Sequence, residues 1–301
     1  HFPFARTTGE SCPSCMPAVL HDWAALLKPQ SEIRALAEAE TPLRVWIDIG
    51  TSYRSLATWD LEHNSSLIVV GIDAMRKHLE HQRQSKSPRF LPVEGACSAA
   101  NRDTVTFYAH GSHTCGTMLK TAQGGPAIGS GSWACTGDTP RTLTVPIFHL
   151  DKLIHSLRKR LPEHRLEFLK LDVQGAELDC LRSGKAELAH VDNILLEVQD
   201  VTTASKLGLY EGAPGINALD SFLDTVGFRR QYCEWNRFTR QIRELNCMYS
   251  NVRKTNVTWL WATGNVKKDR SMVSYGKNRR NYLHLDFVKQ LQTATFLGDR
   301  M

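Results

Sequence analysis

The feature that most constrains the fold is an alternation of short apolar runs and helical patterns, in which successive apolar runs end at acidic residues. Two such runs cover residues 43–50 and 67–73. The segments after them, 52–63 and 75–84, carry apolar residues at helical spacing, and a third short run follows at 89–93. Strands that alternate with helices favour a parallel sheet with right-handed crossovers. The first half of the chain therefore predicts a strand–helix–strand–helix–strand unit.

The second half of the chain continues the same alternation. Its expected helices are 150–160, 176–183 and 216–225, its expected strands are 166–171 and 193–198, and residues 228–234 and 243–250 are expected to form an antiparallel hairpin. Taken together, the two halves predict an α/β fold built on a doubly wound sheet of about seven strands, most of them parallel.

The segment between the two halves loses the helical rhythm. Two β-like pieces at 104–109 and 142–148 bracket a loop rich in Gly and Ser at 124–131. Long loops in compact domains are usually functional or mobile. We therefore expect a β-rich insertion near the ligand-binding face.

The two ends of the chain differ from this central pattern. We expect an irregular lead-in and N-terminal helices over 1–42, one domain over 43–251, and a basic C-terminal extension over 252–301. The extension holds ten Lys and Arg against three Asp, although the whole chain of 301 residues has a net charge of only +6. Such a tail is expected first of all as a solvated extension, with docking on a phosphate group, an acidic glycan or a protein surface as the alternative.

Other partners find little support in the sequence. No zinc-finger or RNA-binding signature indicates a specific nucleic acid. The longest apolar runs are far shorter than the roughly 20 residues that a membrane span requires. We therefore expect neither a specific nucleic acid partner nor a membrane span.

The eight cysteines leave the redox compartment open. Cys115 and Cys135 flank the Gly/Ser-rich loop, and Cys233 and Cys247 flank the expected hairpin. Both pairs are candidates for disulfides if the chain matures in an oxidising lumen.

Three smaller features bear on the compartment and on metals. The CxxC element at 12–15 has no second pair at zinc-ligand spacing, so we expect no metal site. Two glycosylation sequons begin at Asn64 and Asn256, and the chain starts at His1 instead of Met. These features lead us to expect an organelle lumen or the secretory pathway, after removal of a leader.

Four residues stand at the carboxyl ends of the expected strands, where a doubly wound sheet forms its ligand crevice: Asp48, Gly50, Asp73 and Asp172. Gly50 is expected to let a ligand approach the backbone, with free N–H groups presented by the helix that follows. Asp73 lies about twenty residues further on, the spacing of an acid that accepts two hydrogen bonds from a ribose diol. The alternative is that Asp48 and Asp172 merely cap helices.

This arrangement suits either a dinucleotide or S-adenosylmethionine. A dinucleotide fold requires the pattern GxGxxG after the first strand, and residues 50–55 keep only its first glycine. A nicotinamide or flavin cofactor is therefore a minor alternative.

Residues 169–181, with the sequence LKLDVQGAELDCL, resemble the FkbM family of class I methyltransferases. The family segment reads approximately LKIDVEGAE and continues into a helix that ends in glycine, here Gly184. The resemblance spans about 43–250, and its supporting segments, in the family's order, are 46–50, 94–98, 145–153 and 194–199.

The resemblance implies a Rossmann-like fold and methyl transfer from S-adenosylmethionine to a hydroxyl of a sugar or small natural product. In such a displacement the protein chiefly aligns the acceptor, the methyl carbon and the sulfur. Carried over by position, the cofactor-binding residues are Asp48, Gly50 and Ser52 for the methionine part, Asp73 for the ribose, and Gly95, Ala96 and Cys97 for the adenine.

The resemblance also implies roles near the methyl group. Asp172 would face the methyl centre, and Glu177 would fix the turn and the start of the helix. His110, His113 and His149 surround the insertion and are candidate general bases, because imidazole titrates near neutral pH.

Two positions depart from the family pattern. Arg54 stands where the family usually has a second glycine, and Gln174 stands where it has a glutamate. An arginine at this position could fill the cofactor pocket while leaving the sheet intact. The alternative function is therefore a catalytically inactive subunit with a methyltransferase fold, serving as a structural or adaptor component of a larger assembly.

Overall fold

The computed structural model describes residues 16–17, 35, 43–53, 55–84, 87–110, 115–122, 140–161, 163–199, 209–235 and 244–254. The expected N-terminal helices, the Gly/Ser-rich loop and the basic tail lie outside these residues. The chain divides into one unit of residues 1–254 and a second of 255–301, and the description below concerns the first. Within the described part, no helix is both long and apolar enough to cross a bilayer.

The secondary structure alternates along the chain much as expected. The strands are β1 (Met16–Pro17), β2 (Leu43–Ile49), β3 (Leu67–Asp73), β4 (Phe90–Glu94), β5 (Ala96–Cys97), β6 (Thr104–Ala109), β7 (Arg141–Phe148), β8 (His164–Leu171), β9 (Val191–Gln199), β10 (Phe228–Trp235) and β11 (Glu244–Asn251). The helices are α2 (Thr58–His63), α3 (Arg76–Gln84), α4 (Leu150–Arg160), α5 (Glu177–Ser183), the 3₁₀ turn η3 (Leu188–His190) and α6 (Ile216–Thr225).

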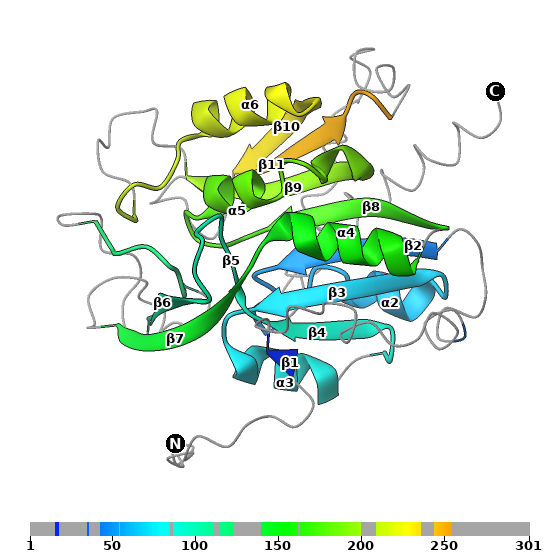
Figure 1. Ribbon diagram of the computed structural model, residues 1–301, viewed down its shortest axis with the longest axis horizontal. Helices are drawn as coiled ribbons and strands as arrows, with labels where there is room; N and C mark the ends of the chain where they lie inside the picture. The colour runs from blue at the N-terminus through cyan, green and yellow to red at the C-terminus, as the bar shows by residue number, and fades with distance from the viewer. Residues whose placement is uncertain are drawn as a thin grey trace, which may run out of the picture. The chain divides into compact units, whose positions relative to one another are not determined.

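An eight-stranded sheet in the order β1-β4-β3-β2-β8-β9-β11-β10 forms the centre (Figure 1). The strands from β1 to β9 in this order pair in parallel, whereas β11 is antiparallel to both β9 and β10. The expected doubly wound and mostly parallel sheet is confirmed. The eighth strand is the two-residue β1, which pairs with β4 at one edge.

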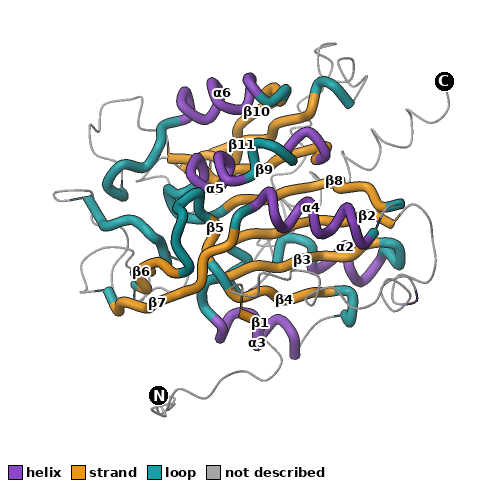
Figure 2. The backbone as a smooth tube through the Cα atoms, in the orientation of Figure 1, coloured by secondary structure: helices purple, strands orange, loops and turns teal. Residues whose placement is uncertain are grey.

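Helices cover the sheet because its central strands are apolar on both sides. Every residue of β3 is buried, as expected of a parallel strand with packed layers on both faces. One large cluster joins alternate residues of the strands to α4, α5 and α6. Figure 2 shows α4 and α5 in front of the sheet, and α2 and α3 both contact β3.

The insertion forms a second, three-stranded sheet in the order β5-β7-β6. β6 and β7 pair antiparallel, with Thr104 opposite Pro146, and β5 pairs in parallel with the end of β7. Val105, Phe107 and Ile147 belong to a small core of its own. The expected β-rich insertion is therefore confirmed in its described strands.

The elements of the second half agree closely with expectation, including α4, α6 and the hairpin of β10 and β11. In the first half of the chain, one helix begins later than predicted. We expected a helix from residue 52, but α2 begins only at Thr58.

Candidate functional site

Two neighbouring strands bring a lysine and two aspartates together at the carboxyl edge of the sheet. β2 and β8 pair with Asp48 directly beside Lys170. The Nζ of Lys170 lies 3.3 Å from Asp48 Oδ1 and 3.3 Å from Asp172 Oδ2, and it donates to the carbonyl oxygen of Gly50 at 3.0 Å. One cation thus joins carboxylates that come from distant parts of the sequence.

The surroundings of Lys170 keep this cluster ionised. Burial alone would lower the pKa of Lys170, but the carboxylates of Asp48, Asp172 and Glu197 outweigh it and raise the pKa. Burial would raise the pKa of Asp172, but Lys170 and hydrogen bonds hold it below its ordinary value. The side chain of Asp172 is 27% exposed, against 4% for Asp48. Asp172 is therefore an ionised acceptor that a ligand can reach.

A third carboxyl group, on β9, completes the cluster. Burial and the charge of Asp172 raise the pKa of Glu197 well above its ordinary value, and the two side chains share a hydrogen bond. Gln174 Nε2 donates to Asp172 Oδ1 and to Glu197 Oε2, each at 3.0 Å, and the Tyr210 hydroxyl donates to Gln174 Oε1 at 2.8 Å. Of the two carboxyl groups, Glu197 therefore holds a proton more readily than Asp172 does.

The turn after β8 is held by its own side chains. Gln174 and Gly175 have positive φ angles of 53° and 96°. Glu177 Oε1 accepts the N–H groups of Val173 at 3.2 Å and Gly175 at 3.1 Å. Burial raises the pKa of Glu177 to about 8, so this side chain is largely protonated at neutral pH. Glu177 fixes the turn and the start of α5, as expected.

Gly50 is required by the packing of the two strands. Its φ angle is +79°, and a Cβ added there would lie 1.8 Å from the carbonyl oxygen of Asp172. The Asp172 N–H also donates to the carbonyl oxygen of Ile49 at 3.0 Å. We expected the missing Cβ to make room for a ligand, but the backbone of Asp172 takes that space.

The segment after β2 is a loop because hydrogen bonds to Asp48 hold it against the end of the sheet. Asp48 Oδ2 accepts the Ser55 hydroxyl at 2.7 Å and the Leu56 N–H at 3.0 Å. Ser52 has a φ angle of +51°, which an α-helix does not allow. Helical geometry therefore starts later than expected, at Thr58.

Two of the N–H groups that we expected to be free, those of Ser52 and Ser55, are already bonded. The Ser52 N–H donates to Asp73 Oδ2 at 2.8 Å, and the Ser55 N–H donates to Gln82 Oε1 at 3.1 Å. By contrast, the hydroxyl of Thr51 is buried and has no hydrogen-bond partner among the described residues. The loop thus offers a side-chain group, instead of backbone N–H groups, to a ligand.

Asp73, at the end of β3, is held in place from three sides. Its Oδ1 accepts the Met75 N–H at 2.7 Å and lies 3.1 Å from His78 Nδ1, while its Oδ2 accepts the Ser52 N–H. The ring of Tyr53 packs against that of His78, with centroids 4.4 Å apart. Oδ2 keeps one further acceptor position, because a carboxylate oxygen accepts two hydrogen bonds.

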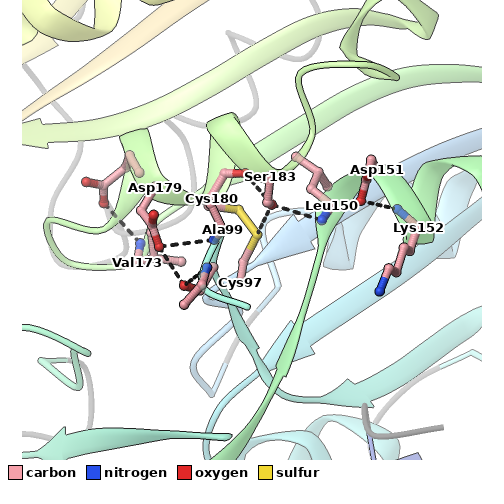
Figure 3. Close-up of a disulfide and its surroundings, with 12 residues drawn as sticks. Cys97, Ala99, Leu150, Asp151, Lys152, Val173, Asp179, Cys180 and Ser183 are labelled. Carbon is pink, nitrogen blue, oxygen red and sulfur yellow. Dashed lines mark hydrogen bonds between the residues drawn. A yellow bond between two sulfur atoms is a disulfide. The ribbon is translucent and has the colours of Figure 1, made fainter. Parts of the chain in front are cut away.

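The residues after β4 lead into a disulfide. The Gly95 N–H donates to the Asp73 carbonyl oxygen at 3.0 Å, and Ala96 and Cys97 form the buried strand β5. Cys97 is bonded to Cys180 of α5, 83 residues further along the chain. Figure 3 shows the sulfur pair between β5 and α5. The Cys97 sulfur is therefore committed to a structural bond that we did not expect.

The other cysteine pairs were expected in part. Cys233 and Cys247 lie opposite each other on β10 and β11 and form a disulfide, which confirms the expected pair. Cys115 is disulfide-bonded as well. The expected pairing with Cys135 falls outside the described residues.

The candidate histidines lie apart from this cluster. Among the described residues, no hydrogen bond or ion pair joins His110 or His149 to Asp172. His110 is buried, which lowers its pKa, and neither ring nitrogen has a hydrogen-bond partner within the described part of the chain. His149 is the residue before α4. His113 and Arg54 lie outside the described residues.

A groove of about 210 Å³ adjoins the turn after β8. Arg102 and Arg182 line it, and neither guanidinium group has a hydrogen-bond or ion-pair partner among the residues that the structure describes. Most of the remaining lining is apolar or glycine: Val105, Met118, Leu119, Gly175, Ala176, Leu178, Gly212 and Pro214. Ser98 and one acid, Asp179, also line the groove, and Asp179 Oδ2 accepts the Ser98 hydroxyl at 2.6 Å and the Ala99 N–H at 3.2 Å. The groove therefore combines apolar walls with two available cations.

Sequence reasoning missed Thr51, Lys170 and Glu197 as members of this region. A signal was present for the last two, because each is a single charged residue within an otherwise apolar strand end. Thr51 gave no such signal, since only the folded loop shows that its hydroxyl is buried without a partner among the described residues.

Comparison with solved structures finds distant likenesses. M. capricolum TrmK in complex with S-adenosyl-homocysteine is 9% identical, with 92% of this chain and 88% of that chain covered and a TM-score of 0.38. A mutant of the 16S rRNA (adenine(1408)-N(1))-methyltransferase from Catenulisporales acidiphilia is 10% identical, with 75% and 92% covered and a TM-score of 0.37. A search of curated protein sequences finds no significant match.

Comparison with protein families gives a direct assignment. Residues 49–230, which include the loop after β2, the turn after β8 and the insertion, match the methyltransferase FkbM domain. This match covers more than half of the chain. The protein therefore belongs to the family of FkbM methyltransferase domains, whose cofactor is S-adenosylmethionine.

Proposed function

We propose that this protein transfers a methyl group from S-adenosylmethionine to a hydroxyl group of a sugar or another small product. The observation that carries the proposal is the position of Asp172. It is an ionised, accessible carboxylate at the carboxyl edge of the sheet, with Lys170 on one side and Glu197, whose pKa is raised, on the other. The winding of the sheet reverses between β2 and β8, which is where such sheets bind their ligands.

The residues around the loop after β2 fit the cofactor through side chains. The buried hydroxyl of Thr51 lacks a partner among the described residues, which is costly unless a ligand supplies one. Asp73 keeps one acceptor position on Oδ2 and is oriented by Met75 and Ser52, so it offers one hydrogen bond to a ribose hydroxyl. When bound, S-adenosylmethionine supplies an electrophilic methyl group on a positively charged sulfur.

Asp172 is the residue we assign to the acceptor hydroxyl. Its ionised carboxylate accepts a hydrogen bond from that hydroxyl and orients the oxygen. It then takes the proton that the hydroxyl loses as its oxygen gains the methyl group. Gln174 donates a hydrogen bond to Asp172 and another to Glu197, so the geometry of the pair is fixed before substrate binds.

The groove beside the turn is the proposed acceptor site. At about 210 Å³ it suits a small acceptor on the scale of a single sugar. Arg102 and Arg182 are available to bind an acidic substituent of the acceptor, and the apolar walls cover its carbon skeleton. An acceptor in this groove lies next to Gly175, three residues after Asp172.

Calorimetric titration with S-adenosylhomocysteine tests cofactor binding. We expect saturable binding by the unmodified chain. Thr51→Val should weaken it about fivefold, because one neutral hydrogen bond contributes about 1 kcal/mol. Thr144→Val, at an exposed position of β7, is the matched control and should leave the affinity unchanged. Absence of heat at millimolar ligand would contradict the proposal and favour the inactive subunit of a larger assembly.

Release of S-adenosylhomocysteine in the presence of a panel of neutral and acidic monosaccharides tests the transfer itself. Asp172→Asn should lower the rate about a hundredfold, the usual contribution of a positioned proton acceptor, while the affinity for S-adenosylhomocysteine stays within a factor of about three. An unchanged rate in Asp172→Asn would overturn the role assigned to Asp172.

A further inference from the structure

A second cleft lies at the amino-terminal ends of the parallel strands, whereas Asp172 lies at their carboxyl ends. It has a volume of about 390 Å³ and is lined by Arg158, His164, Arg165, Leu166, His190 and Lys254, which we call the basic cleft. These residues come from the end of α4, the start of β8, the end of η3 and the segment after β11. In Figure 1 the arrowhead of β3 points towards β6 and β7, so the starts of the parallel strands lie at the far edge.

The cations of the basic cleft face outward, and the acids that bind them lie behind. Arg158 Nη1 donates to Glu187 Oε2 at 2.7 Å. Lys254 Nζ donates to Asp192 Oδ1 at 3.0 Å, and Arg165 pairs with the other oxygen of Asp192. The three cations are 35–39% exposed, whereas Glu187 is 16% and Asp192 only 5% exposed. The carboxylates thus orient the cations from beneath, and no acid among the described residues lines the cleft itself.

Burial and the neighbouring cations both disfavour protonation of the two histidines in the cleft. Burial, followed by the charges of Arg158, Lys254 and His190, lowers the pKa of His164 to about 4. Burial and Arg158 also lower the pKa of His190, although Glu187 opposes this effect. The positive charge on the lining of the cleft therefore comes from Arg158, Arg165 and Lys254, with both histidines disfavoured as further cations.

We propose that the basic cleft binds a small molecule that carries a phosphate group. Several guanidinium and ammonium donors converging on one concave space suit the tetrahedral oxyanion of a phosphate monoester. The cleft is enclosed by four separate elements and has the volume of a small-molecule site, which favours a compact ligand over a nucleic acid strand. The site is independent of methyl transfer, because its residues belong to the far edge of the sheet.

Calorimetry with D-ribose 5-phosphate at constant ionic strength tests the proposal, with D-ribose as the uncharged probe. We expect saturable binding of the phosphate ester and none of ribose. Arg158→Gln keeps a hydrogen-bond donor for Glu187 but removes the charge, and it should weaken binding at least about tenfold. Lys159→Gln makes the same change at the next residue of α4, outside the cleft, and should leave binding within a factor of about two.

A second measurement does not depend on the variants folding. In the unmodified protein, a bound phosphate should raise the pKa of His190, followed by the NMR shift of its ring protons, because the phosphate offsets the neighbouring cations. The proposal is overturned if ribose 5-phosphate shows no saturable binding below about 10 mM, or if Arg158→Gln and Lys159→Gln weaken its binding equally. It is also overturned if an oligonucleotide binds the protein and ribose 5-phosphate does not displace it.

Discussion

Lys170 shows how one residue organises the candidate site. It lies on β8 beside Asp48 of β2 and reaches Asp172 at the end of its own strand. A buried lysine is costly unless acids surround it, and a buried acid is costly unless a cation does. Each member therefore depends on the others. The site is a single electrostatic unit and not a set of separate ligand contacts.

Glu177 gives a prediction on pH dependence. Its pKa is raised to about 8 in the folded protein by burial, above the 4.5 of an ordinary glutamate, so its stabilising effect is complete below pH 4.5 and is lost as the pH rises through 8. Glu177→Gln keeps the oxygen that accepts the Val173 and Gly175 N–H groups but does not titrate. Between about pH 5 and about pH 8.5, we expect the Glu177→Gln variant to lose less unfolding free energy than the unmodified chain. The difference should reach up to about 4 kcal/mol.

Urea unfolding at the two pH values measures this difference. Glu62→Gln, at an exposed position of α2, is the control and should behave as the unmodified chain does. Other titrating groups are present in all three proteins and cancel in the comparison. A Glu177→Gln variant that loses as much free energy as the unmodified chain would show that Glu177 is ionised in the fold.

At the scale of single residues, sequence reasoning placed the acids correctly but not their contacts. Asp48, Asp73 and Asp172 do stand at the carboxyl ends of β2, β3 and β8, because apolar runs that end in an acid are readable from the chain. What occupies the space around Gly50 is not readable, since the backbone of Asp172 comes from a strand far along the chain. Long-range contacts of this kind appear only in the folded structure.

At the scale of elements, the disulfide between β5 and α5 joins two segments that border the site. β5 follows Gly95, and α5 follows the turn that Glu177 holds. The Ser183 hydroxyl accepts the Leu150 N–H at 3.0 Å beside this bond, so the start of α4 is fixed to the same point (Figure 3). Three elements are therefore anchored together.

Removal of this disulfide is predicted to affect both stability and binding. A bond that closes a loop of 83 residues stabilises by about 4 kcal/mol in the chain-entropy model. The double variant Cys97→Ala, Cys180→Ala should lose about that much unfolding free energy, measured with urea. It should also bind S-adenosylhomocysteine more weakly, because the segments beside the site are released.

The second disulfide is the matched control for that experiment. Cys233 and Cys247 are 14 residues apart on the last two strands in the order of the sheet. Their removal should cost about 3 kcal/mol but leave the affinity for S-adenosylhomocysteine unchanged. Equal effects of the two double variants on that affinity would contradict a local role for the bond of Cys97. Disulfides persist mainly in oxidising compartments, in keeping with the expected lumen.

Elements were easier to predict than the loops between them. The apolar alternation of α4 and α6 decides their limits, because each buries one face against the sheet. α2 begins late because Asp48 binds Ser55 and Leu56, and this tertiary contact overrides the local helical pattern. The partner of Cys97 was equally hidden, since spacing alone does not show which cysteines meet.

At the scale of the whole molecule, all of the described core lies in the first unit of the chain. The buried apolar residues among those described run from Leu43 to Tyr249. Because residues 1–254 form one compact unit and residues 255–301 another, we expect a chain that ends at Lys254 to unfold cooperatively, with a midpoint within about 2 °C of the full chain, which corresponds to about 1 kcal/mol or less at this size. Circular dichroism and calorimetry with S-adenosylhomocysteine measure both properties.

The same truncation tests what the basic extension does. If the extension serves assembly, which is the alternative to a solvated extension, the shortened chain should lose its partners in size-exclusion chromatography while keeping its midpoint. A fall of the midpoint by about 10 °C or more would show instead that the extension belongs to the fold, since it corresponds to several kcal/mol.

Because β2 pairs with β8, the centre of the sheet can be completed only after β8 has been synthesised. A nascent polypeptide emerges from the ribosome with β2 early and β8 only after the insertion and α4 have followed. Until then the edge of β2 that β8 will cover is open, and an unpaired edge of this kind attracts other strands. We therefore expect the risk of wrong strand pairing to be greatest between the synthesis of Ile49 and that of Leu171.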